Sequence, residues 1–202
     1  MEKYREQIEK FVPTCEQEIK DKELILECID TYQNKILTRE IKIAHLTASG
    51  LICNHDFTKI LMAYHNIYDS WSWTGGHVDG DFDLYEVALK EATEEVGITN
   101  LKAFSSDIIS LEILPVYGHI KRDQYVSCHL HLNVTYVFIA DENEKVKAKE
   151  DENSGVMWIK ERELEKYCTE EEMIPVYRKI INSVLKIKNA DYLWVIGIKC
   201  SV

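Results

Sequence analysis

A glycine pair followed by an acidic loop and an acidic helix, residues 75–98, constrains the fold more than any other segment of this chain. Asp83 and Glu86 form a capping-box pattern, which predicts that a helix begins after Asp83. Gly97 predicts the end of that helix. Just before the glycines, residues 71–73 predict a short strand. We therefore expect a strand, a glycine-containing loop and a helix in immediate succession.

Three glutamates occupy one face of this predicted helix. Glu91, Glu94 and Glu95 are spaced i, i+3 and i+4, so their carboxylates are neighbours. In an isolated helix, each such like-charged pair costs a few tenths of a kcal/mol. A divalent cation would reverse the sign of that cost, and Mg²⁺ prefers carboxylate oxygens together with water and substrate phosphates. The alternative interpretation is an ordinary solvated acidic helix face.

The whole segment resembles the Nudix box, the signature motif of the Nudix hydrolase family. The motif aligns with Gly76–Ile98 of this chain. Phe82 stands where the motif has its first glutamate, and Lys90 stands where it has an arginine. Those two family residues form an ion pair, and here Asp81 or Asp83 is a candidate partner for Lys90. The matching residues are Gly76, Glu91, Ala92, Glu94, Glu95, Gly97 and Ile98.

The resemblance implies a fold and a chemistry. The implied fold is an α/β/α sandwich with a mixed sheet. The implied activity is hydrolysis of a diphosphate bond in a nucleoside diphosphate linked to another moiety. Mg²⁺, or alternatively Mn²⁺, would be held by Glu91, Glu94 and Glu95 and would activate water for attack at phosphorus. Glu94, Glu95 and Glu152, which lies shortly before a predicted strand, are the candidates for the catalytic base.

Glycine and histidine residues are the candidates for substrate binding. Gly75, Gly76 and His77 place backbone N–H groups where a phosphate would bind, although the glycines equally suit a tight turn. His129 and His131 lie on the polar side of a predicted strand and are candidates for hydrogen bonding to the substrate. Two other interpretations stay open for this pair, a structural role and a transition-metal site with His119 as third ligand.

The rest of the chain predicts two regions, an N-terminal helical extension over residues 1–38 and a Nudix domain over residues 39–202. The clearest strand pattern covers 125–140, where apolar and polar residues alternate. The remaining predicted strands cover 43–53, 59–65, 108–114 and 156–159, and the remaining helices cover 3–11, 161–167 and 175–186.

Charge and cysteine usage exclude several functional classes. The 24 Lys and Arg against 35 Asp and Glu give a net charge of −11, so a nucleic-acid partner is not expected. Small phosphorylated substrates remain possible where metal ions lie between the carboxylates and the phosphates. The 6 cysteines show no C-x-x-C spacing, and the polar N-terminal residues predict no signal peptide. No apolar run approaches the ~20 residues of a membrane helix. We expect a cytoplasmic protein, and a homodimer is a reasonable expectation from the family.

Two other functions are weighed against hydrolysis. An isopentenyl-diphosphate isomerase, which belongs to the same superfamily, needs a cysteine and a glutamate, and Cys53 and Cys128 fall in predicted strands without a matching motif. A degenerate domain that senses nucleotides or binds proteins is favoured by Phe82 and Lys90. Retention of all three helix glutamates argues against this binding module.

Overall fold

The computed structural model describes residues 2–67, 69–121, 123–149 and 153–195, with side chains described as far as residue 190. Glu152 lies outside these ranges. The helices are α1 (Lys3–Lys10), α2 (Glu16–Tyr32), α3 (Leu84–Val96), α4 (Leu164–Tyr167) and α5 (Met173–Val195), with 3-10 helices η1 (Gln33–Leu37) and η2 (Glu161–Glu163). The strands are β1 (Ala44–Cys53), β2 (Lys59–His65), β3 (Ser70–Ser72), β4 (Thr74–His77), β5 (Lys102–Ala103), β6 (Ser110–Val116), β7 (His119–Lys121), β8 (Gln124–Val126), β9 (His129–Ile139) and β10 (Asn153–Lys160).

Within the described residues, eight strands form one mixed sheet whose main path is β10-β2-β1-β9-β5. The central strands β1 and β9 pair in parallel, with His45 opposite His131 and Thr47 opposite Asn133. β4 pairs with the middle of β1 in antiparallel fashion, with Thr47 opposite His77. Every residue of β1 is buried, as expected for a strand covered on both faces.

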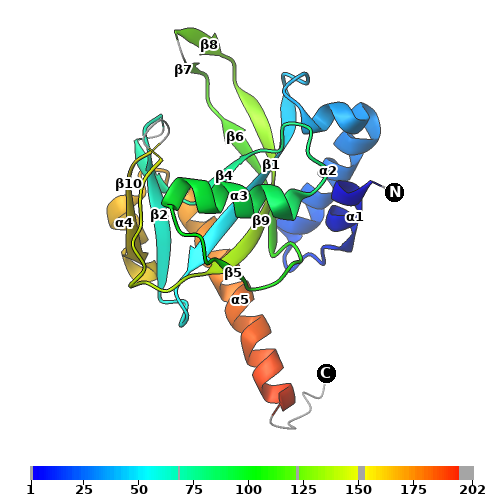
Figure 1. Cartoon of the computed structure of the whole chain (residues 1–202). Coiled ribbons are helices and arrows are strands. Elements are labelled where there is room, and N and C mark those ends of the chain that lie inside the picture. The colour runs from blue at the N-terminus through cyan, green and yellow to red at the C-terminus, as the bar shows by residue number, and fades with distance from the viewer. Residues whose placement is uncertain (1, 68, 122, 150–152, 196–202) are drawn as a thin grey trace.

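Successive side chains of β1 enter two separate hydrophobic clusters because they point to opposite faces of the sheet. Leu46, Ala48 and Ile52 pack toward α3. Leu51 and Cys53 pack with residues of α5. Figure 1 shows the resulting three layers, with α3 on one face of the sheet and α5 on the other. The expected α/β fold with a mixed sheet and an N-terminal helical extension is confirmed.

The N-terminal helices share the core of the α3 side. Tyr4 and Ile8 of α1 and Ile25 and Ile29 of α2 are buried in the same hydrophobic cluster as Leu84 of α3. Figure 1 shows both helices lying beside the sheet. The division of the chain at residues 38 and 39 into two regions stays a prediction.

Most predicted elements are found, with one clear difference. The strand predicted over 125–140 is confirmed over 129–139 as β9, but its first part is wrong, because β8 ends at Val126 and β9 begins at His129. β8 pairs with β7 in a separate two-stranded ribbon, which projects from the body in Figure 1. An alternating pattern continues across such a break because both segments are strands, so the sequence does not reveal it. No helix in the described part of the chain is long and apolar enough to cross a membrane.

Candidate active site

Glu95 attaches α3 to the glycine-containing strand β4. Its side chain is buried, and Oε1 accepts a hydrogen bond from the backbone N–H of Gly75 at 2.9 Å. Its Oε2 accepts a second one from Nδ2 of Asn153, on β10, at 3.0 Å. Two N–H donors thus hold one carboxylate in a single orientation between two strands, which is the kind of support that a precise site requires.

Glu91 lies directly against Gly76. A Cβ atom placed on Gly76 would be 2.9 Å from Cδ of Glu91, closer than real Cβ contacts. The absence of a side chain at position 76 therefore lets the carboxylate approach the backbone of β4. Glycine is used here for close approach rather than for its backbone angles, since only Gly80 and Gly97 among the described glycines have positive φ.

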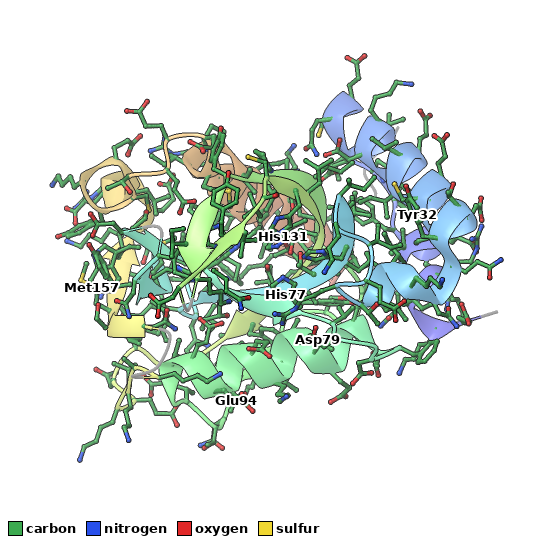
Figure 2. All side chains as sticks on the ribbon, turned by 90° about the horizontal axis from the view of Figure 1, so that it is seen from above. Tyr32, His77, Asp79, Glu94, His131 and Met157 are labelled. Atoms are coloured by element: carbon green, nitrogen blue, oxygen red, sulfur yellow. The ribbon has the colours of Figure 1, made fainter. Side chains whose placement is uncertain are left out.

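Glu94 is the more accessible member of the triplet. Its side chain is 43% exposed, and its Oε2 lies 3.6 Å from Nζ of Lys149. In Figure 2, Glu94 lies on α3, apart from the labelled histidines. Lys149 and Asn153, which contact Glu94 and Glu95, flank the segment that contains Glu152. The role of Glu152 as a base stays a prediction.

The start of α3 is stabilised by α1 and not by a capping box. The helix begins after Asp83 as predicted, but the capping box itself is not formed, because the side chain of Asp83 makes no cap hydrogen bond. Instead, Oε1 of Gln7 accepts the N–H of Leu84 at 3.2 Å, and Nε2 of Gln7 donates to Asp83 at 3.1 Å. Asp83 also accepts a hydrogen bond from Lys3. A residue that precedes α3 by more than seventy positions thus supplies the cap.

Phe82 also belongs to this contact with α1. Its ring lies 5.9 Å from that of Tyr4, measured between centroids. The candidate partners of Lys90 are engaged elsewhere, since Asp83 binds Lys3 and Gln7, and Asp81 accepts the N–H of Asp83 at 2.9 Å. The two departures from the motif therefore coincide with an N-terminal helix that secures the start of α3 by other contacts.

The histidines of the candidate site lie on the opposite side of β4 from Glu91. A Cβ on Gly75 would meet Ser49, whereas one on Gly76 would meet Glu91, so successive residues of β4 face opposite sides. His77 shares the side of Gly75, and its ring lies 4.8 Å from that of His45. The glycine-containing loop expected from the sequence is strand β4, with His77 as its last residue and its side chain on the side away from Glu91.

Four histidines meet on this side of the sheet: His45, His77, His129 and His131. His119, the expected third member, lies on β7 and is not among them. Sequence reasoning missed His45 because a single histidine in a buried apolar strand is usually structural. The missing information was the parallel pairing of β1 with β9, which puts His45 opposite His131.

Burial changes the protonation of the inner histidines. Together with the neighbouring histidines and Arg39, it lowers the pKa of His45 to about 4, that of His77 to about 3 and that of His131 to about 2. Each imidazole is therefore neutral at pH 7. Rings in this state donate one hydrogen bond and offer one lone pair.

The cysteines considered for isomerase chemistry are poorly suited to it. Cys53 is buried in the cluster that packs against α5, and burial raises the pKa of its thiol to about 12. Cys128 is exposed between β8 and β9, where its Sγ accepts the N–H of Gly118 at 3.1 Å. Neither thiol belongs to a cluster with the helix glutamates.

Comparison with known proteins agrees with this geometry. The family model described as NUDIX domain matches residues 44–181. The structure resembles that of the E. coli dihydroneopterin triphosphate pyrophosphohydrolase, with a TM-score of 0.54 and 14% identity over 68% of this chain and 95% of that one. It also resembles a hydrolase of the NUDIX family from Clostridium perfringens, with a TM-score of 0.50 and 18% identity over 68% of this chain and 96% of that one. Among curated protein sequences, none matches significantly.

At these identities the solved structures show a common fold, and the family assignment depends on the model match. That match covers more than half of the chain and includes β1, β4, all of α3 and the beginning of α5. The chain therefore belongs to the Nudix family.

Proposed function

We propose that this chain is a Mg²⁺-dependent hydrolase that cleaves a diphosphate bond in a nucleoside diphosphate derivative. The observation that carries the proposal is the acidic face of α3 held against the glycine pair, with Glu95 bonded to Gly75 and Glu91 against Gly76. Family membership supports the same conclusion. The structural relative from E. coli is named as a triphosphate pyrophosphohydrolase, which is the same class of reaction.

The donor set fits Mg²⁺. Carboxylate oxygens are the protein ligands that this ion prefers, and Glu91, Glu94 and Glu95 supply them from one helix face. The gap left by Gly76 gives the Glu91 carboxylate its place beside the backbone. Mn²⁺ suits the same oxygen ligands. When bound, the ion would neutralise the diphosphate and acidify a water molecule for attack at phosphorus.

The three glutamates and the backbone of β4 would have different roles. Glu91 and Glu94 would hold the metal ion. Glu95 would act mainly by positioning β4, because each of its oxygens already accepts an N–H. The N–H of Gly75 is donated to Glu95 and that of Gly76 points toward β1 in the β1–β4 ladder, so among the candidate phosphate-binding groups of β4 that of His77 remains. As the catalytic base, we prefer Glu152 or Glu94, the latter because it is accessible, to Glu95.

The non-enzymatic alternative has lost its main support. Phe82 and Lys90 suggested a degenerate domain, and the contact of Phe82 with Tyr4 gives the first of them a structural reason to be present. We further propose a small-molecule substrate without a nucleic-acid partner and a cytoplasmic location, and the homodimer stays a prediction.

The test is hydrolysis of a panel of nucleoside diphosphate derivatives with Mg²⁺ and with a chelator. Glu94→Gln is the informative variant, because Glu94 is accessible and its replacement leaves the Glu95 hydrogen bonds in place. Loss of a metal ligand or a base should lower kcat by at least about 100-fold. Glu86→Gln, an exposed change on α3 outside the acidic face, is the matched control and should keep full activity. Turnover without metal, or none across the panel with Mg²⁺ and Mn²⁺, would contradict the proposal.

A further inference from the structure

Four imidazoles from three strands converge at the end of the strand that carries the glycine pair. His45 comes from β1, His77 from β4, and His129 and His131 from β9. One ring nitrogen from each lies within 4.8 Å of the others. The centroid distances from His45 to His77, His129 and His131 are 4.8, 4.9 and 5.1 Å. Figure 2 shows His77 and His131 close together above α3.

Three ring nitrogens of this cluster lack protein partners within the part of the chain that the structure describes. Both ring nitrogens of His45 and Nε2 of His131 are buried without a hydrogen-bond partner among the described residues. An unpaired buried polar group costs about 1–3 kcal/mol, so three such atoms in one cluster call for a ligand. A bound metal ion would accept the lone pair of one His45 nitrogen and that of His131 Nε2, which are two of these three atoms.

We propose that His45, His77, His129 and His131 form a binding site for a transition-metal ion of the Zn²⁺ class, separate from the carboxylate site on α3. Imidazole nitrogen suits Zn²⁺, Cu²⁺ and Ni²⁺, whereas Mg²⁺ prefers oxygen ligands, so the two sites differ in the metal that they select. Four protein ligands are typical of a closed structural site and not of a catalytic one.

The surroundings support a metal ligand set. His129 Nδ1 lies 2.9 Å from the carbonyl oxygen of Ser127, and donation to that oxygen leaves Nε2 free to bind a metal. The inner rings are neutral at pH 7, as metal binding requires. The carboxylate of Asp79, which would compete with the histidines for the ion, instead accepts hydrogen bonds from Nε and Nη2 of Arg39 at 3.1 and 2.8 Å.

The ring nitrogens need to move only slightly closer together to bind one metal ion. In a tetrahedral site with Zn–N bonds of about 2.0–2.1 Å, the ligand nitrogens are about 3.4 Å apart. The widest spacing of 4.8 Å would therefore close by roughly 1.4 Å, which is within the range of side-chain rotation. The bound ion would join β1, β4 and β9 at the end of the glycine-containing strand.

The experiment measures Zn²⁺ binding by calorimetry, with chain that has been dialysed against a chelator and an excess of Mg²⁺ present to occupy the carboxylates. Co²⁺ serves as a second probe, because its visible absorption reports tetrahedral nitrogen coordination. We expect one equivalent of Zn²⁺ per chain and a rise in Tm on binding. Replacing one ligand, as in His131→Asn, should weaken binding by more than about 100-fold.

The control variants distinguish the histidine site from the carboxylate site and from a general loss of folding. His129→Asn, at the partly exposed start of β9, tests the same site if His131→Asn fails to fold, as checked by circular dichroism. His119→Asn and Glu94→Gln should both retain Zn²⁺ binding. Absence of Zn²⁺ binding, its retention in folded His129→Asn, or its loss in Glu94→Gln would overturn the proposal. Binding of inorganic phosphate instead of Zn²⁺ would also overturn it and would assign the cluster to an anion.

Discussion

Replacement of Lys179 by methionine is the sharpest test of how the N-terminal extension is attached to the rest of the chain. Nζ of Lys179, on α5, lies 3.0 Å from Glu18 of α2 and 2.9 Å from Glu112 of β6. Both carboxylates are almost fully buried. One ammonium group therefore pairs with two buried carboxyl groups, and the three residues belong to three separate elements.

The magnitude follows from this geometry. Removing one partner from a buried ion pair costs about 3–5 kcal/mol, because the remaining charge is left uncompensated. Methionine keeps most of the volume of the lysine stem, so the loss is electrostatic and not a cavity effect. At about 2–4 °C per kcal/mol for a chain of this size, Tm should fall by roughly 6–20 °C.

The dependence on pH gives a second readout. Burial raises the pKa of Glu112, and Lys179 and Ser110 act against that shift. Without Lys179, protonation of Glu112 would relieve the unpaired charge, so the destabilisation should be largest near pH 8 and smaller near pH 5. In the wild type, burial favours a higher pKa for Glu18, but Thr14 and Lys179 lower the pKa overall. The stability contributed by Glu18 should therefore be present above its unfolded pKa and be lost as pH falls through its lower folded value.

The assay is urea unfolding at both pH values, with Lys186→Met as the matched control. Lys186 is exposed on the same helix, so its replacement should change the free energy of unfolding by less than about 0.5 kcal/mol. A loss below about 1 kcal/mol in Lys179→Met, or a loss that grows as pH falls, would refute the reasoning.

Two further changes test contacts that surround α3. Gln7→Ala removes the cap on Leu84 and should lower Tm by about 2–4 °C, the equivalent of about 1 kcal/mol. The control Lys10→Ala, on the exposed end of α1, should leave Tm unchanged. Equal Tm values for Gln7→Ala and the wild type would exclude the cap. Gly76→Ala places a Cβ 2.9 Å from Cδ of Glu91, so the carboxylate must move, and we expect the Mg²⁺ concentration for half-maximal hydrolysis to rise several-fold. An unchanged Mg²⁺ dependence in Gly76→Ala would show that Glu91 does not need this position.

Local features of the structure were accessible from the sequence alone. The helix period places Glu91, Glu94 and Glu95 on one face, and Gly97 ends α3 with a positive φ of 72°, as its position predicted. The strand over residues 59–65 was predicted with its observed bounds. These features depend on residues within a few positions of one another, whose relation is set by the backbone geometry of a single element.

Other features depend on how distant elements meet, and no periodicity within one segment reveals them. Gln7 caps α3 only because α1 packs at its start, and Glu18, Glu112 and Lys179 meet only where α2, β6 and α5 converge. His45 joins His131 only because β1 and β9 pair in parallel in one register, since a shift by one residue would turn every side chain to the other face. The sequence by itself therefore determined the acidic helix and its family, whereas the tertiary structure decided the cap, the buried ion cluster and the meeting of the four histidines.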